Sequence, residues 1–309
     1  MNTRMWRNQW TAAIVALFLL MSAGAWLIFN YASNEKERDF RAWETLLGVV
    51  AESRTQSLNQ WIDSQYGVVR ELAENASLRF YISQVVSTPE AATVDSQAAQ
   101  FAYLRNLLET TAEKNSFSQS GQKQKIQANI ASVSDSGIII VDIAGKTVVG
   151  TAGFMADDTL ITTILRTLKE RKPTLLDIYE NRNGEVVLGF AVPVFPTQAS
   201  GASDQQPIAA IIGVKRARDE LFPLLLQKGT LTSADETLLI RKEDDSVAFI
   251  SPLADGTAPL RKRLSLSTQN MAEVIALANS PGFSMSLDYA GREVLAASRN
   301  FRQTPWILI

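Results

Sequence analysis

An uninterrupted apolar segment near the N-terminus is the feature that most restricts how this chain can fold. No charged residue occurs in positions 8–34, and Thr11–Tyr31 is almost wholly apolar. A helix over this segment is about 31 Å long at about 1.5 Å per residue, which matches the hydrocarbon core of a bilayer. The aromatic residues Trp10 and Tyr31 lie at its ends, where aromatic rings favour the interface. The sequence therefore predicts a transmembrane helix over 11–31, after a cytoplasmic tail over 1–10.

A cleaved signal peptide is the alternative interpretation of this segment. Arg4 and Arg7 form a short positive region, and residues 23–25 (Ala-Gly-Ala) have the small-x-small pattern of a cleavage site. The apolar run continues past that point through residues 26–29 (Trp-Leu-Ile-Phe), which favours an uncleaved anchor.

The orientation of this anchor does not follow from charge alone, because Lys and Arg residues flank both of its ends. The short N-terminal tail and the large folded remainder favour an N-terminus inside the cell. We therefore expect a single pass through the plasma (inner) membrane, with the bulk of the chain extracytoplasmic, that is, periplasmic.

Composition excludes several function classes. The 309 residues include 30 Lys and Arg, 32 Asp and Glu, no Cys and no His. There is thus no thiol nucleophile, no Ser-His-Asp triad and no thiolate or imidazole zinc site. The near-neutral charge balance offers no basic surface for nucleic acid. We expect no enzyme activity in this chain, no cofactor, no metal site and no nucleic-acid partner.

A long stalk helix and a second helix are predicted over residues 32–115. No proline precedes Pro89, and apolar residues recur at steps of three and four across 34–86, which is typical of one buried helix face. Arg54 and Gln65 interrupt this stripe. A helical pattern resumes over Gln97–Lys114. The stripe is compatible with a homodimer through the long helix, and a plain helical bundle is the alternative for this region.

After Gly137 the period changes to that of strands. We expect a hairpin, a helix, a second hairpin, a fifth strand and a connecting helix, and then a shorter version of the same order. The expected elements of the first unit are strands 138–142 and 147–150, helix 157–172, strands 175–179, 185–194 and 208–214, and helix 218–227. Those of the second unit are strands 237–241 and 247–250, helix 270–278, and strands 283–289, 293–299 and 306–309. The fold class is α+β, with two five-stranded antiparallel sheets.

Local motifs in these units do not indicate catalysis. The Gly-Lys-Thr at 145–147 lies in a strand–turn–strand context, so a hairpin turn is favoured over a phosphate-binding loop. The acidic pairs at 157–158 and 244–245 lie at a helix start and a turn tip, where carboxylates cap and solvate. The similar segments at 142–146 (DIAGK) and 288–292 (DYAGR) are explained by shared turn chemistry rather than by an internal repeat.

The succession of an anchor, a long proline-free helix and two sheet units resembles the double Cache family of extracytoplasmic sensors. The similarity covers residues 34–309, and its strand-like segments are IIIVDIAGKTVVGT, GEVVLGFAVPV, ETLLIRKEDDSVAFISPL, DYAGREVLAAS and PWILI. The resemblance implies a membrane-distal PAS-like lobe over 116–229 and a membrane-proximal one over 230–309. In that family a second transmembrane helix follows the last strand, so we expect a piece of a longer receptor that ends at Ile309 before its output domain.

Ligands of PAS-like lobes bind between the sheet and the helices that cross it. The candidate ligand-binding residues of the distal lobe are Asn129, Asp142, Tyr179 and Phe190. Those of the proximal lobe are Arg241, Asp288 and Tyr289, which we expect to form a polar cluster. Amino-acid-sensing members of the family carry an Arg-x-Trp-Tyr-type signature that is absent around Ser116–Asp142, so an amino-acid ligand is not indicated.

The resemblance implies the sensory input domain of a histidine kinase, a diguanylate cyclase or a chemoreceptor. Such a domain binds a small ligand and relays a conformational change through its long helix. A membrane-anchored binding or structural protein without a signalling output is the alternative.

Overall fold

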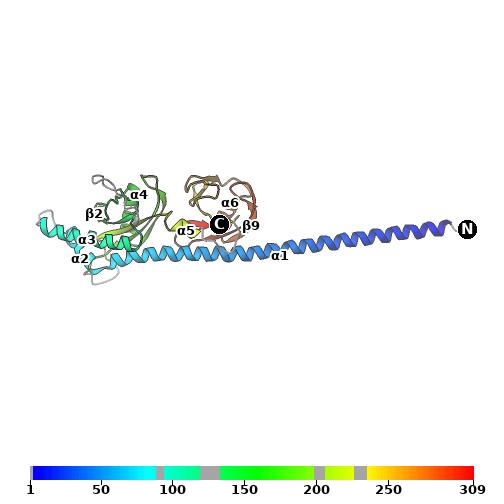
Figure 1. The fold of residues 1–309 in the computed structure, drawn as a ribbon, viewed down its shortest axis with the longest axis horizontal. Helices are drawn as coiled ribbons and strands as arrows, with labels where there is room; N and C mark the ends of the chain where they lie inside the picture. Colours follow the sequence, from blue (N-terminus) through cyan, green and yellow to red (C-terminus); the bar gives the residue numbers. More distant parts are fainter. Residues whose placement is uncertain (1–2, 88–93, 119–132, 198–205, 226–234) are drawn as a thin grey trace.

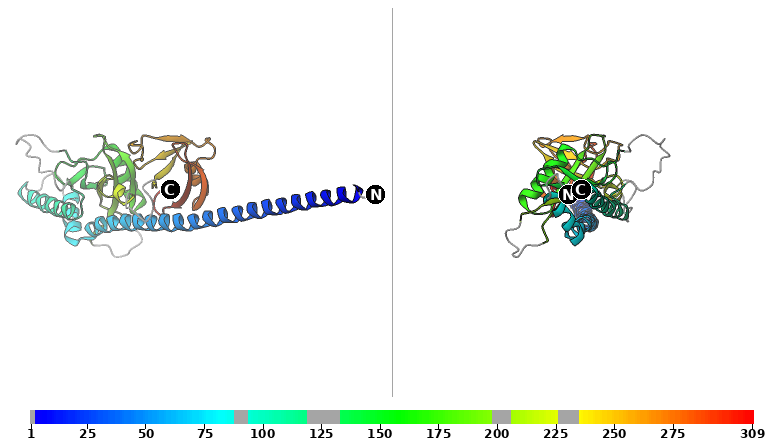
Figure 2. Two further views of the ribbon diagram at one scale, coloured as in Figure 1. Left: turned by 45° about the vertical axis from the view of Figure 1, so that its right-hand side comes forward. Right: turned by 90° about the vertical axis from the view of Figure 1, so that its left-hand side faces the viewer.

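The chain forms two lobes that lie side by side along one long helix (Figure 1). The computed structural model describes residues 3–87, 94–118, 133–197, 206–225 and 235–309. The predicted lobe boundary at 229/230 lies outside these residues. We call the lobe that carries β1–β5 the N-terminal lobe and the lobe that carries β6–β11 the C-terminal lobe. Both lie on the same side of the helix (Figure 2).

The long helix α1 (Thr3–Glu74) has 72 residues and is therefore about 108 Å long. Its N-terminal part projects beyond both lobes (Figure 1), and large apolar side chains between Phe18 and Tyr31 are exposed there. Among the residues whose side chains the structure describes, no helix is both long and apolar enough to cross a bilayer.

The predicted helix over 34–86 is interrupted at Asn75, which corrects the expectation of one unbroken helix. Helix α2 (Ala76–Ser87) begins directly after it. The Asn75 side chain accepts a hydrogen bond from the backbone N–H of Leu78 at 3.0 Å, so Asn75 caps the new helix. The chain then enters α3 (Val94–Lys114), which contains the second predicted helix.

The N-terminal lobe has the predicted five-stranded antiparallel sheet. The order of strands is β2-β1-β5-β4-β3. Its elements are β1 (Gly137–Asp142), β2 (Thr147–Gly150), α4 (Asp158–Glu170), β3 (Thr174–Glu180), β4 (Val186–Val194), β5 (Ala209–Arg216) and α5 (Leu221–Leu225). Helix α5 is shorter than the connecting helix predicted over 218–227, whose last two residues lie outside the described part of the chain.

The C-terminal lobe has a sheet of six strands, not the predicted five. The order is β8-β7-β6-β11-β10-β9. Its elements are β6 (Leu239–Glu243), β7 (Ser246–Phe249), β8 (Arg263–Ser265), α6 (Ala272–Asn279), β9 (Gly282–Leu287), β10 (Glu293–Asn300) and β11 (Trp306–Leu308). The extra strand β8 has only three residues and pairs with β7 at the sheet edge. Its single apolar residue, Leu264, gives no alternation that sequence reasoning can detect.

Three hairpins share one turn geometry, which confirms the explanation of the similar segments by turn chemistry. A side-chain oxygen of Asp142 accepts hydrogen bonds from the backbone N–H groups two and four residues later, both at 2.9 Å. Asp288 makes the equivalent bonds at 2.8 and 2.9 Å, and Asn181 makes them at 2.9 Å. Gly145 and Gly291 have φ of +84° and +80°, a conformation that glycine adopts at the least cost.

One apolar face of α1 packs against both sheets. In the N-terminal lobe Leu58, Ile62 and Val69 are fully buried on this face. Phe190 of β4 meets the rings of two α1 residues, Trp61 and Tyr66, in edge-to-face contacts. In the C-terminal lobe Ala51 of α1 is buried in the same core cluster as residues of β10 and β11. The shared helix thus joins the cores of the two lobes.

A buried polar contact ties α1 to the N-terminal lobe. Lys215 of β5 is 3% exposed, and its Nζ lies 2.6 Å from Glu220 Oε1. The same carboxylate accepts a hydrogen bond from Trp61 Nε1 at 2.8 Å. Burial lowers the pKa of Lys215, an effect that the hydrogen bond to Glu220 only partly offsets. Glu220 therefore accepts hydrogen bonds from the buried Lys215 and the half-buried Trp61.

We predict that Glu220→Ala lowers the free energy of unfolding by about 3 kcal/mol, because it leaves the Lys215 ammonium buried without a partner. Urea unfolding measures this change. The neighbouring Asp219→Ala is the control, since Asp219 forms a half-exposed pair with Arg216 that contributes about 0–1 kcal/mol. Equal losses in the two variants would contradict the assignment.

Candidate ligand-binding site

A cavity of the C-terminal lobe has the size of a small-molecule site. Its volume is about 320 Å³, within the range of about 300–1,000 Å³ that is usual for ligand pockets. Its walls come from α1, the start of α6, the β9–β10 hairpin, β10 and β11. We call it the α1 cavity. Apolar side chains that line it include Trp43, Leu47, Val50, Val294, Leu295 and Leu308.

The α1 cavity also has a small set of charged side chains. These are Arg54, Asp235, Glu236, Glu273, Asp288 and Arg292. A mostly apolar pocket with a few convergent polar groups is the usual form of a ligand site.

Glu273 is the most deeply buried of these groups. It is the second residue of α6 and is 1% exposed. Its Oε1 accepts a hydrogen bond from the backbone N–H of Tyr289 at 3.1 Å. Its Oε2 is buried and has no hydrogen-bond partner. Burial raises the pKa of Glu273, and Asp288 adds to the rise, while backbone N–H donors and Lys262 oppose it.

The other acidic groups of the α1 cavity have partners. Arg292 donates a hydrogen bond to Asp288 Oδ2 at 2.7 Å. Burial acts to raise the pKa of Asp288, but hydrogen bonds from Arg292 outweigh it and hold the pKa below the ordinary value. The Tyr289 hydroxyl donates to Glu236 Oε2 at 2.7 Å. Asp235 interacts electrostatically with Arg54. Burial lowers the pKa of Arg54, and the charge of Asp235 opposes this effect.

The N-terminal lobe contains a smaller and more polar cavity of about 170 Å³. Tyr179 lines it and donates a hydrogen bond to Asp157 Oδ2 at 2.7 Å. Burial, and then this hydrogen bond to the carboxylate, raise the pKa of Tyr179. Asp135 accepts hydrogen bonds from the side-chain amides of Asn181 and Asn183 at 2.9 and 2.8 Å. These polar groups already satisfy one another.

The structure separates the residues that the sequence suggested for the N-terminal lobe. Tyr179 lines the smaller cavity. Asp142 holds a hairpin turn, and Phe190 is buried against α1. Asn129 lies outside the described residues. Of the three residues that the structure describes, only Tyr179 lines that cavity.

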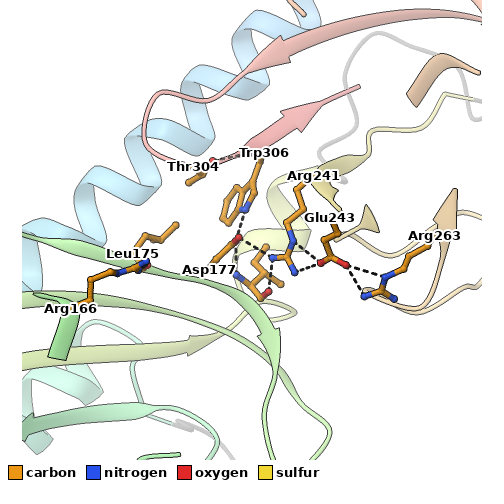
Figure 3. Close-up of polar contacts among 9 residues, drawn as sticks. Arg166, Leu175, Asp177, Arg241, Glu243, Arg263, Thr304 and Trp306 are labelled. Atoms are coloured by element: carbon orange, nitrogen blue, oxygen red, sulfur yellow. Dashed lines mark hydrogen bonds and ion pairs between the residues drawn. The ribbon is translucent and has the colours of Figure 1, made fainter. Parts of the chain in front are cut away.

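The three residues suggested for the C-terminal lobe do not form one cluster. Asp288 and Tyr289 both line the α1 cavity. Arg241 instead lies at the junction of the lobes (Figure 3). Its Nη1 donates to the Ile178 carbonyl at 2.8 Å and lies 2.9 Å from Asp177 Oδ2.

Figure 3 shows Asp177 of β3 placed between Arg241 and Trp306. Trp306 Nε1 donates to Asp177 Oδ1 at 2.6 Å. Arg241 also pairs with Glu243, which in turn holds Arg263 at 2.8 Å. Arg241 therefore joins the two lobes through β3, apart from either cavity.

Sequence reasoning missed Arg54, Glu236 and Glu273 as site residues. Arg54 did leave a signal, because it interrupts an apolar helical stripe. Glu273 left a weaker one, since an acidic residue in the first turn of a helix has an ordinary explanation in the helix dipole. Its contact with the β9–β10 hairpin, through the Tyr289 N–H, joins residues that lie apart in the sequence.

Two lobes with the same core strand order are mounted on one long helix, which is the architecture that the resemblance to double Cache sensors implies. This confirms the resemblance at the level of the fold. The periplasmic sensory domain of the Campylobacter jejuni chemoreceptor Tlp1 is similar, with 13% identity, a TM-score of 0.55, and coverage of 87% of this chain and 94% of that one. The extracellular domain assigned to a histidine kinase, vpHK1S-Z8, has 13% identity and a TM-score of 0.54, with coverage of 89% and 93%.

A third similar structure is much longer than this chain. It is the extracellular ligand binding receptor from Desulfohalobium retbaense DSM5692, with 15% identity and a TM-score of 0.48. The match covers 86% of this chain and 40% of that receptor chain. No family model and no curated protein matches the sequence.

We predict that Glu273→Gln raises the free energy of unfolding at about pH 7.5 by about 1 kcal/mol, because it removes an unpaired buried charge. The folded-state pKa of Glu273 lies above its unfolded value. The wild type therefore loses stability as pH rises through that folded pKa, and the variant does not. At about pH 2.5, well below the ordinary pKa of a Glu carboxyl, that carboxyl is protonated in both states, and the two proteins should be equally stable. Urea unfolding at both pH values measures this, and a variant less stable at about pH 7.5 would contradict it.

Proposed function

We propose that this chain is the extracytoplasmic sensory input domain of a bacterial signal-transduction receptor, of the histidine kinase, diguanylate cyclase or chemoreceptor type. A small molecule bound in the α1 cavity is its signal. The observation that carries the proposal is that α1 and the last strand, β11, are both walls of this cavity. No catalytic role is assigned to the chain.

The proposed mechanism is a population shift. A ligand in the α1 cavity touches Leu47 and Val50 on α1 and also Leu308 on β11. It therefore stabilises one arrangement of the helix relative to the sheet, by as much as its affinities for the two arrangements differ. A small shift or rotation of α1 carries the change toward the N-terminal end of the helix.

The N-terminal part of α1 is proposed as a single membrane anchor with the N-terminus inside. The apolar run of the sequence and the exposed apolar side chains between Phe18 and Tyr31 support this. A contiguous exposed apolar surface on a projecting helix is typical of a site that contacts a membrane or another protein. Both lobes then lie outside the cytoplasm, in the periplasm.

A homodimer through α1 is also proposed. Leu46 and Val49 of α1 are exposed beside the stripe that packs on the lobes, and these apolar side chains support a contact with a second copy.

The proposal predicts that a screen of metabolites against the full chain yields a ligand that raises the melting temperature, because binding to the native state adds stability. Val294→Trp, which fills the α1 cavity, should abolish that rise. Ile143→Trp, at an exposed hairpin turn, should retain it. Differential scanning fluorimetry measures both.

Two results would count against the proposal. The absence of any stabilising compound would contradict a sensory role of the α1 cavity. A shift that persists in Val294→Trp would place the ligand elsewhere in the chain.

A further inference from the structure

We propose that the α1 cavity takes an organic cation, namely a protonated amine joined to an apolar group. This inference rests on the proposed function of the cavity and specifies the chemical class of its ligand.

The balance of charge in the α1 cavity is the first observation. Its lining contains the four carboxylates of Asp235, Glu236, Glu273 and Asp288, and two guanidinium groups. Arg292 is held by Asp288 at 2.7 Å, and Arg54 faces Asp235. With both cations engaged, the cavity keeps a net negative charge. An anionic ligand would meet that charge, and both guanidinium groups of the lining are already engaged.

The unpaired Oε2 of Glu273 is the second and independent observation. Capping of α6 does not explain it, because Oε1 already accepts the Tyr289 N–H. The side chain is 1% exposed, and Oε2 has no partner within the structure. A buried carboxylate oxygen without a donor is costly. An ammonium group supplies charge-assisted N–H donors for such an oxygen.

The apolar walls determine the rest of the ligand. Trp43, Leu47 and Leu295 line the α1 cavity and offer an aromatic ring and aliphatic surface. Within the part of the chain that the structure describes, no group of three or more carboxylates is arranged to hold a metal ion. A bare metal cation would also have no apolar group to pack against the apolar walls of the cavity. An amine with an apolar body satisfies both parts of the lining.

The test compares three probes that carry the same phenyl group and differ in charge. It uses isothermal titration calorimetry on the full chain in detergent, with a protein-free titration subtracted. The probes are 2-phenylethylammonium, 2-phenylethanol and 3-phenylpropionate. We expect the ammonium probe to bind at least tenfold more tightly than the other two. This comparison needs no variant.

Two variants locate the binding. Glu273→Gln should weaken binding of the ammonium probe at least tenfold while the protein remains folded by its thermal melt. Glu113→Gln is the matched control, because Glu113 is exposed on α3, and it should bind as the wild type does. Unchanged binding in Glu273→Gln would overturn the assignment.

Other outcomes separate this inference from the proposed function. No binding of the ammonium probe, or equal or tighter binding of the alcohol or carboxylate probe, overturns the cationic class. If the metabolite screen still gives a ligand whose effect is lost in Val294→Trp, the sensory role of the cavity stands. If that screen also fails, both proposals fall.

Discussion

The packing of one helix face against two sheets is the constraint on which the rest of the structure depends. One apolar face of each sheet packs against α4 or α6, and the face that packs against α1 would be exposed without that helix. On α1, Leu58 and Ile62 pack in the core of the N-terminal lobe, and Leu47 and Ala51 pack in that of the C-terminal lobe. Because the same rigid element is a wall of both cores, a change in how it packs on one lobe bears on the other.

The two lobes differ in the volume of the side chains that their sheets present to α1. Strands β4 and β10 hold the same place in their sheets, next to the edge strands β3 and β9. On β4 the large Phe190 fills the space against Trp61 and Tyr66. On β10 Ala296 and Ala297 line the corresponding region, so the α1 cavity remains. The close packing of the N-terminal lobe against α1 is suited to a structural role. The cavity in the C-terminal lobe is suited to ligand binding.

Much of the fold was predictable because its signals are local. Apolar periodicity indicated α1 and α3, and Asp-x-x-Gly turns indicated the hairpins. The break at Asn75 was not predictable by periodicity, because a cap changes direction without changing composition. Most of the candidate site could not be predicted from the sequence, because the α1 cavity is lined by residues that lie far apart in it, such as Arg54, Glu273 and Ala297. Their meeting depends on strand register and on the path of α1, which no local pattern encodes.

The central claim is that ligand in the α1 cavity moves α1 against the C-terminal sheet. The chain has no Cys, so cysteines introduced at the exposed positions Glu44 of α1 and Met285 of β9 can be spin-labelled without background. Pulsed electron paramagnetic resonance then measures the distance between the labels with and without 2-phenylethylammonium. The account predicts a change of about 1–2 Å in the mean distance, the scale of helix shifts in signalling proteins. An unchanged distance distribution at a saturating concentration of a probe that calorimetry shows to bind would contradict it.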